Sequence, residues 1–209
     1  MDLLLTFIDW VLHVEKHLLV FIDNYGTWVY ALLFLIIFCE TGLVFMPFLP
    51  GDSLLFVVGV LCGSGHMSLE IVCPLLIAAA FIGDNTNYWI GRKFGLTKLN
   101  RLIKPTHLQK AESFYQKHGG KTVLLARFAP IVRTIAPFVA GLGKMPYNRF
   151  MAFSIAGGIL WVGCLTILGY YFGGLPWIRD NLTVVGIVIV LLSLLPAMIT
   201  ALHSRFFRS

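Results

Sequence analysis

Four charged residues lie inside apolar stretches that proline and glycine interrupt. Glu40 and Asp52 flank one interruption, and Arg127 and Arg133 flank another. Each charge costs about 2.5–3.5 kcal/mol at the centre of a membrane helix, so four would cost on the order of 10 kcal/mol unless they pair or face water. The sequence therefore predicts that these residues are kept for a function.

The two acids are predicted to couple protons. A carboxylate removed from water holds its proton more tightly than one in water. Such a group can bind and release a proton near neutral pH, as proton-coupled transport requires. The alternative is that Glu40 and Asp52 only neutralise Arg127 and Arg133, and both roles are compatible.

The two arginines are predicted to bind the phosphate of an anionic ligand. A guanidinium group stays charged, and its planar fork fits a phosphate bidentately. Helix N-termini that end within the membrane would add favourable dipoles. The alternative is that both side chains snorkel to the inner interface. The position of Arg133 between Pro130 and Pro137 favours anion binding.

A third polar cluster holds Asp84, Asn85 and Asn87. One possibility is that this cluster, in particular Asp84 and Asn87, lines the same cavity as the four charged residues. The other is that it forms the polar end of a membrane span, and the sequence leaves both open. The chain has no H-E-x-x-H motif and no P-loop. We therefore expect no catalytic residues, no metal site and no cofactor, and regard an enzyme as the least expected class.

Composition identifies a polytopic membrane protein. The 209 residues are 58% hydrophobic and only 12% charged, and the mean hydropathy is +0.83. The net charge of +6 could suggest a nucleic-acid partner, but half of the sixteen Lys and Arg residues fall in the single stretch 92–121. By the positive-inside rule this stretch is cytoplasmic, so the charge follows membrane topology and we expect no nucleic acid.

The elements that must position the four charges follow from hydropathy, and we predict an all-α fold in a single domain, 1–209. A short arm such as 53–63 favours re-entrant hairpins, because a span needs about 20 residues. The predicted elements are an amphipathic N-terminal helix within 1–25, a re-entrant hairpin at 28–64 broken at Pro47, Pro50 and Gly51, a span at 69–91, the basic stretch 92–121, a second re-entrant hairpin at 122–144 broken at Pro130 and Pro137, and spans at 150–173 and 182–203.

The predicted path makes the first hairpin open outward and the second open inward, and it leaves the C-terminus in the cytoplasm. That layout is an inverted repeat, which secondary transporters use to build sites from broken helices at mid-membrane. Residues 3–22 either lie at the interface or form a poor span, and the interface is favoured.

The chain resembles the DedA family, also called the SNARE-associated or VTT-domain family. The resemblance covers nearly the whole chain, and its most specific motif is R-F-x-P-x-x-R-T-x-x-P-x-x-A-G from Arg127 to Gly141. Other matching text is Phe38-Cys39-Glu40-Thr41-Gly42-Leu43-Val44, the run Pro47 to Phe56, Gly83-Asp84, Asn87-Tyr88, Gly91-Arg92 and Lys117 to Lys121.

The resemblance implies a multi-pass protein of the bacterial inner membrane that moves lipid between leaflets. Bacterial members are linked to recycling undecaprenyl phosphate, envelope integrity and proton motive force, and eukaryotic relatives to phospholipid scrambling. The family's key acids correspond to Glu40 and Asp52, and its key arginines to Arg127 and Arg133. Some relatives carry Glu where this chain has Asp52. Because the side chain of Asp52 is shorter, the resemblance leaves open the proton affinity and the reach of this carboxylate.

The expected function is therefore a proton-linked lipid transporter, or flippase, whose partners are protons, the membrane and an anionic headgroup of undecaprenyl phosphate or a phospholipid. The alternatives are a proton–cation antiporter that uses the same acids for membrane-potential homeostasis, and a structural membrane module. The sequence leaves the lipid, the direction, the coupling stoichiometry and the oligomeric state open.

Overall fold

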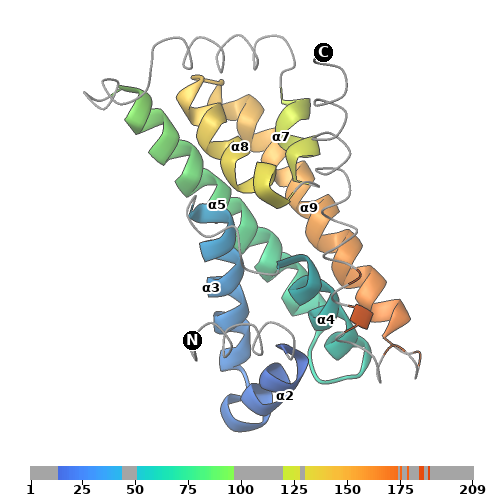
Figure 1. Cartoon of the computed structure of the whole chain (residues 1–209). Helices are drawn as coiled ribbons and strands as arrows, with labels where there is room; N and C mark the ends of the chain where they lie inside the picture. The colour runs from blue at the N-terminus through green and yellow to red at the C-terminus, as the bar shows by residue number, and fades with distance from the viewer. Residues whose placement is uncertain are drawn as a thin grey trace, which may run out of the picture. The chain divides into compact units, whose positions relative to one another are not determined.

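The computed structural model describes residues 14–43, 51–96, 120–127 and 130–173, with isolated positions at 175, 178, 184, 185 and 188. Within these ranges every regular element is an α-helix, as the sequence predicts (Figure 1). The helices are α2 (Val14–Tyr25), α3 (Trp28–Gly42), α4 (Gly51–Gly63), α5 (Leu69–Leu96), α7 (Lys121–Ala126), α8 (Pro130–Leu142) and α9 (Tyr147–Phe172).

Two of the described helices are long and apolar enough to cross a membrane, over Leu69–Lys93 and Tyr147–Phe172. They correspond to the spans predicted at 69–91 and 150–173. The helices α3, α4 and α8 have 15, 13 and 13 residues, fewer than the ~20 that a span needs. Residues 1–13, the breaks at Pro47 and Pro50, most of the basic stretch 92–121 and most of the span predicted at 182–203 lie outside the described residues.

Helix α5 begins at Leu69, as the predicted span does, and continues past residue 91 to Leu96. The side chain of Arg92 turns back along the helix and donates hydrogen bonds to the Tyr88 hydroxyl at 2.6 Å and to the Met145 carbonyl at 3.3 Å. Basic residues near a helix C-terminus also interact favourably with the helix dipole. Asp84 and Asn87 therefore lie inside the helix, not at its end.

The chain divides into two compact units. Unit 1 comprises 1–36, 48–76 and 162–209, and unit 2 comprises 37–47 and 77–161. In unit 1, Gly51 to Cys62 of α4 are buried. A Cβ on Gly59 would overlap the Thr166 carbonyl, and one on Gly169 would overlap the Phe56 carbonyl. Glycines thus let the backbones of α4 and the C-terminal part of α9 approach closely.

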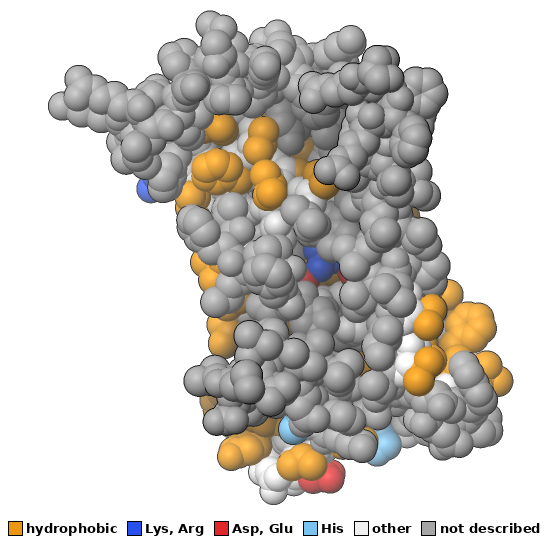
Figure 2. Space-filling view, in the orientation of Figure 1, with side chains coloured by type: hydrophobic (Ala, Val, Ile, Leu, Met, Phe, Trp, Pro, Cys, Tyr) orange, Lys and Arg blue, Asp and Glu red, His pale blue; other side chains and the backbone are white. Residues whose placement is uncertain are grey.

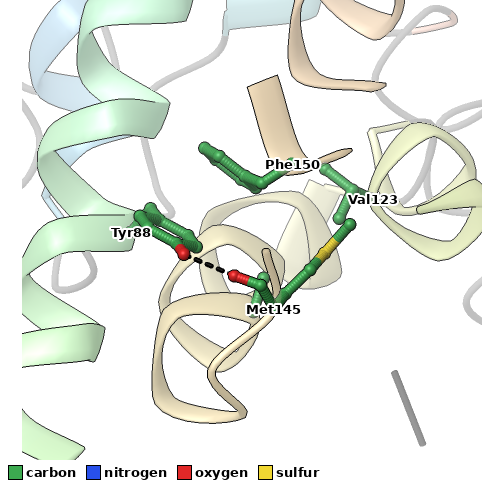
Figure 3. Close-up of a cluster of buried hydrophobic side chains, with 5 residues drawn as sticks. Tyr88, Val123, Met145 and Phe150 are labelled. Atoms are coloured by element: carbon green, nitrogen blue, oxygen red, sulfur yellow. Dashed lines mark hydrogen bonds between the residues drawn. The ribbon is translucent and has the colours of Figure 1, made fainter. Parts of the chain in front are cut away.

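Unit 2 is built around a cluster of Tyr88, Val123, Ala140, Met145 and Phe150 (Figure 3). The Tyr88 ring stacks on Phe150 with centroids 4.4 Å apart, and the Tyr88 hydroxyl donates to the Met145 carbonyl at 2.5 Å. Helices α7 and α8 pack against each other. A Cβ on Gly141 would overlap the Tyr88 carbonyl, so α8 lies directly against the C-terminal part of α5, which fixes the position of α8.

Large apolar side chains remain exposed on both long helices. Trp89 of α5 and Ile159, Leu160 and Ile167 of α9 are between 46% and 53% exposed. Figure 2 shows hydrophobic side chains in several separate groups on the face in view. Exposed apolar faces of this extent suit contact with lipid, and they agree with the two apolar spans.

Candidate functional site

Arg133, one of the two predicted arginines, lies in the first turns of α8. Its Nη2 atom donates to Oε1 of Glu40, in the last turn of α3. The Arg133 side chain is 6% exposed and that of Glu40 is 0% exposed. A charged side chain buried to this degree needs a partner of opposite charge, and each of these two residues supplies one for the other.

The helix dipoles make this pair unusual. A helix C-terminus carries partial negative charge, which disfavours an acid such as Glu40, and a helix N-terminus disfavours a base such as Arg133. Both residues thus oppose the dipole of their own helix, and each compensates the other. Neither residue therefore stabilises the helix that carries it.

The second pair joins Arg127 to Asp84. Arg127 is the C-cap of α7, where its backbone N–H bonds the carbonyls of Leu124 and Leu125. Its Nη2 atom donates to Oδ2 of Asp84 on α5. The same carboxylate oxygen accepts a hydrogen bond from the Ser154 hydroxyl at 2.6 Å. The side chains of Arg127 and Asp84 are each 5% exposed.

Trp161 of α9 brings the two arginines together. The Cζ atom of Arg133 lies 4.6 Å from the centroid of the Trp161 ring, and that of Arg127 lies 5.7 Å from it. Both distances are within cation–π range. The two guanidinium groups repel each other, but the carboxylates of Glu40 and Asp84 bring the summed charge of the four groups to zero.

Glycines of α9 make room for the arginine. An ideal Cβ at Gly157 would lie 3.1 Å from Cδ of Arg127, and one at Gly158 would lie 3.7 Å from its Nη1. Ser154, Gly157, Gly158 and Trp161 recur at the spacing of one helical face. The Arg127 side chain therefore packs against this face of α9.

Asn87 links three helices behind the ion pairs. Its Nδ2 atom donates to the Thr134 carbonyl of α8 at 2.6 Å and to the Thr41 carbonyl at the end of α3 at 3.2 Å. A Cβ on Gly83 would overlap the Thr41 hydroxyl, so α3 and α5 approach closely there. These contacts fix the helix turn that carries Glu40 against the one that carries Arg133.

A small cavity lies among these groups. Its volume is about 10 Å³, and it is lined by Thr41, Asp84, Val123, Arg127, Arg133 and Pro137. A cavity needs about 10–15 Å³ to hold one water, so this one is smaller than a phosphate group. The Nη1 atom of Arg127 is buried and makes no hydrogen bond within the described part of the chain. Figure 2 shows basic and acidic side-chain atoms together near the middle of the face in view.

The structure gathers four of the predicted residues, Glu40, Asp84, Arg127 and Arg133, into this quartet in unit 2. Both arginines are buried within unit 2. Asp52 is buried in the first turn of α4 and belongs to unit 1. Among the predicted breaks, Gly51 begins α4, Pro130 begins α8, and Pro137 lies inside α8 and lines the cavity. The described residues contain no group of three or more His, Cys, Asp or Glu able to hold a metal.

The sequence analysis missed Ser154 and Trp161. Both lie on α9, whose sequence we interpreted only as an apolar span at 150–173. The signal was the spacing of Ser154, Gly157, Gly158 and Trp161, which places one hydroxyl, two gaps and one indole on the same helical face. A hydroxyl and two glycines on one helical face indicate that a long side chain of another helix packs against that face.

In its described residues the chain is a helical membrane protein that buries two arginine–carboxylate pairs. Residues 49–171 match the family model for the VTT domain. The chain belongs to the DedA (VTT-domain) family, and the full-length relatives agree.

Several curated proteins are similar over most of this chain. Protein DedA of Escherichia coli strain K12 is 48% identical over 212 aligned positions, which cover 98% of this chain and 96% of that protein. An uncharacterized membrane protein of Mycobacterium leprae, ML0287, is 44% identical over 80% of this chain and 77% of its own length. Inner membrane protein YqjA of E. coli K12 is 42% identical over 70% of this chain and 69% of its own length. No solved structure matches the chain.

Proposed function

We propose that this protein is a transporter, not an enzyme, and that it moves a phosphate-bearing lipid headgroup between the leaflets of a bacterial inner membrane in a proton-linked cycle. Undecaprenyl phosphate or a related phospholipid is the substrate class. The observation that carries the proposal is the placing of two buried guanidinium groups over one indole ring. Two guanidinium forks together suit a phosphate, which accepts several charge-assisted hydrogen bonds.

The transport cycle requires the arginines to change partners. The cavity is smaller than a phosphate, and both arginines hold carboxylates. Phosphate therefore enters only if Glu40 and Asp84 release the guanidinium groups. Proton uptake by Glu40 would weaken its pairing with Arg133 and bias the protein between outward-facing and inward-facing states. Asp52, the other proposed proton-coupling acid, would take up its proton elsewhere in the cycle. The lipid tail stays in the bilayer while the headgroup crosses.

The topology that suits this cycle has two re-entrant hairpins in inverted orientation, about three full spans and a cytoplasmic C-terminus. The short helices α3, α4 and α8 support the hairpins, because none has the length of a span. Non-helical backbone at membrane depth is tolerated where it is buried in protein or lines a wet cavity. The two hairpins would then move against the long spans and open the site to either side.

The experiment that tests the proposal measures movement of fluorescent undecaprenyl phosphate headgroups in proteoliposomes, with and without a pH gradient. We expect gradient-sensitive movement by the natural protein and a loss of tenfold or more in Arg133→Lys, because a point charge replaces a fork. Arg149→Lys is the matched control, since Arg149 is exposed. Natural rates in Arg133→Lys would contradict the bidentate role.

The buried ion pair of Arg133 with Glu40 also favours a second candidate, a structural module in which only the pairing matters. That candidate predicts that Glu40→Gln/Arg133→Gln restores function in cells, whereas a lipid transporter stays inactive. A proton–cation antiporter would instead show proton flux in vesicles that lack the lipid.

A further inference from the structure

The buried quartet of Glu40, Asp84, Arg127 and Arg133 is electrically neutral. Arg127 forms an ion pair with Asp84 and Arg133 forms one with Glu40, and all four side chains are at least nine-tenths buried. A phosphomonoester carries close to two negative charges above neutral pH. If it took both arginines, two carboxylates would lose their partners inside the protein, and an unpaired buried charge is strongly unfavourable.

We propose that Glu40 and Asp84 each take up one proton when a phosphomonoester displaces them, so that binding consumes two protons. The inference rests on the proposed function, since it assumes that the arginines receive the phosphate. The charges balance. Two cations and two carboxylates give zero before binding, and two cations, one dianion and two neutral carboxyl groups give zero afterwards.

Asp84 is as well placed for this role as Glu40. The charged groups that act on it within the described residues are Arg127, with which it pairs, and Arg133. Ser154 also faces it and donates to Oδ2 at 2.6 Å. A hydroxyl can donate or accept, so Ser154 can hold the ionised carboxylate and, after protonation, accept from the carboxyl O–H. The contact therefore serves both protonation states.

Trp161 gives both arginines one fixed partner during the exchange. Its ring contacts the two guanidinium groups through its face, which leaves their N–H edges for oxygen ligands. The ring can therefore hold both groups in place while carboxylate oxygens leave and phosphate oxygens arrive. The Nη1 atom of Arg127, buried without a hydrogen bond within the described residues, is one donor already available to the incoming phosphate.

The test is titration calorimetry of the purified protein with decyl phosphate at pH 8, in two buffers of different ionisation enthalpy, which gives the number of protons taken up. We expect two for the natural protein, one for Asp84→Asn and one for Glu40→Gln. Asp23→Asn is the matched control, because Asp23 is exposed on α2, and it should still give two.

The pH dependence of affinity sharpens the test. Uptake of two protons makes the dissociation constant rise about 100-fold per pH unit where both carboxylates are ionised in the free protein, and one proton makes it rise about tenfold. Asp84→Asn should therefore halve the slope on a logarithmic scale. An unchanged slope in that variant would overturn the assignment of Asp84.

Binding without proton uptake would overturn this inference and leave the proposed function standing. Absence of binding would overturn both. If a variant fails to fold, infrared difference spectra of the natural protein give the same answer. Decyl phosphate should produce new absorption from two protonated carboxyl groups, and a spectrum without it would contradict the proposal.

Discussion

Unit 1 and unit 2 form close helix contacts in the same way. In unit 1 the short helix α4 meets the C-terminal part of α9 through Gly59 and Gly169. In unit 2 the short helix α8 meets the C-terminal part of α5 through Gly141 and Gly91. In each contact an added Cβ would overlap a backbone carbonyl of the other helix. In both units, glycines therefore allow a short helix to pack closely against a long one.

The two units differ in what they bury beside these contacts. Unit 1 buries Phe56 and Val60, and its Cys73 sulfur lies 3.1 Å from the Thr166 hydroxyl. Its acid, Asp52, lies in the first turn of α4, where a helix dipole favours an acid. Unit 2 buries two complete ion pairs, and in one of them both residues oppose their helix dipoles. The glycine contacts of both units are made by backbone atoms and do not depend on these charges, so the buried ion pairs of unit 2 point to function.

The largest expected effect comes from breaking a pair in unit 2. Arg133→Met leaves Glu40 buried without its cation, and we expect a loss of about 3–5 kcal/mol in the free energy of unfolding. Denaturation in mixed micelles measures the loss. Arg149→Met, at an exposed position, should change stability by about 0.5 kcal/mol or less.

The double variant Glu40→Gln/Arg133→Met separates stability from function. It should recover most of the lost stability, because no unpaired charge is left, but it should stay inactive in lipid transport. Full transport by the double variant would show that the pair is structural and that unit 2 is no different in kind from unit 1.

A smaller effect is expected from disrupting the close glycine contacts between helices, which both units contain. Gly59→Ala in unit 1 and Gly141→Ala in unit 2 each force two helices apart, and overpacking of this kind costs about 1–3 kcal/mol. Gly163→Ala is the control, because a Cβ there meets nothing within 4 Å. Thermal unfolding in detergent compares the three variants. Equal stability of all three would contradict the close contacts in both units.

The smallest effect is expected at the aromatic partner of the arginines. Trp161→Leu removes both cation–π contacts, which we expect to cost about 0.5–2 kcal/mol and to slow transport several-fold. Trp28→Leu in unit 1 is the control, since Trp28 is 72% exposed. Stability assays and headgroup movement are measured together. If Trp28→Leu slows transport as much as Trp161→Leu, Trp161 has no special role.

The sequence predicted the charged residues of the site better than their pairing. Intramembrane charge singled out Glu40, Arg127 and Arg133, together with Asp52, because charge inside an apolar run is rare. Asp84 was named only as a possible cavity residue, with the polar end of a span as the alternative. The partner of each depends on the rotation of α5 and α9 about their axes, which hydropathy does not determine. For the same reason Ser154 and Trp161 were missed.

The central claim is that a lipid phosphate contacts Arg127 and Arg133. The most direct measurement is solid-state NMR of arginine-labelled protein in bilayers with undecaprenyl phosphate, using the loss of guanidinium ¹⁵N signal caused by nearby ³¹P. We predict loss at two arginine signals, one of which disappears from the spectrum in Arg127→Lys and the other in Arg133→Lys, while Arg149→Lys leaves both. Loss confined to other arginines, with these two signals unaffected by the lipid, would contradict the account.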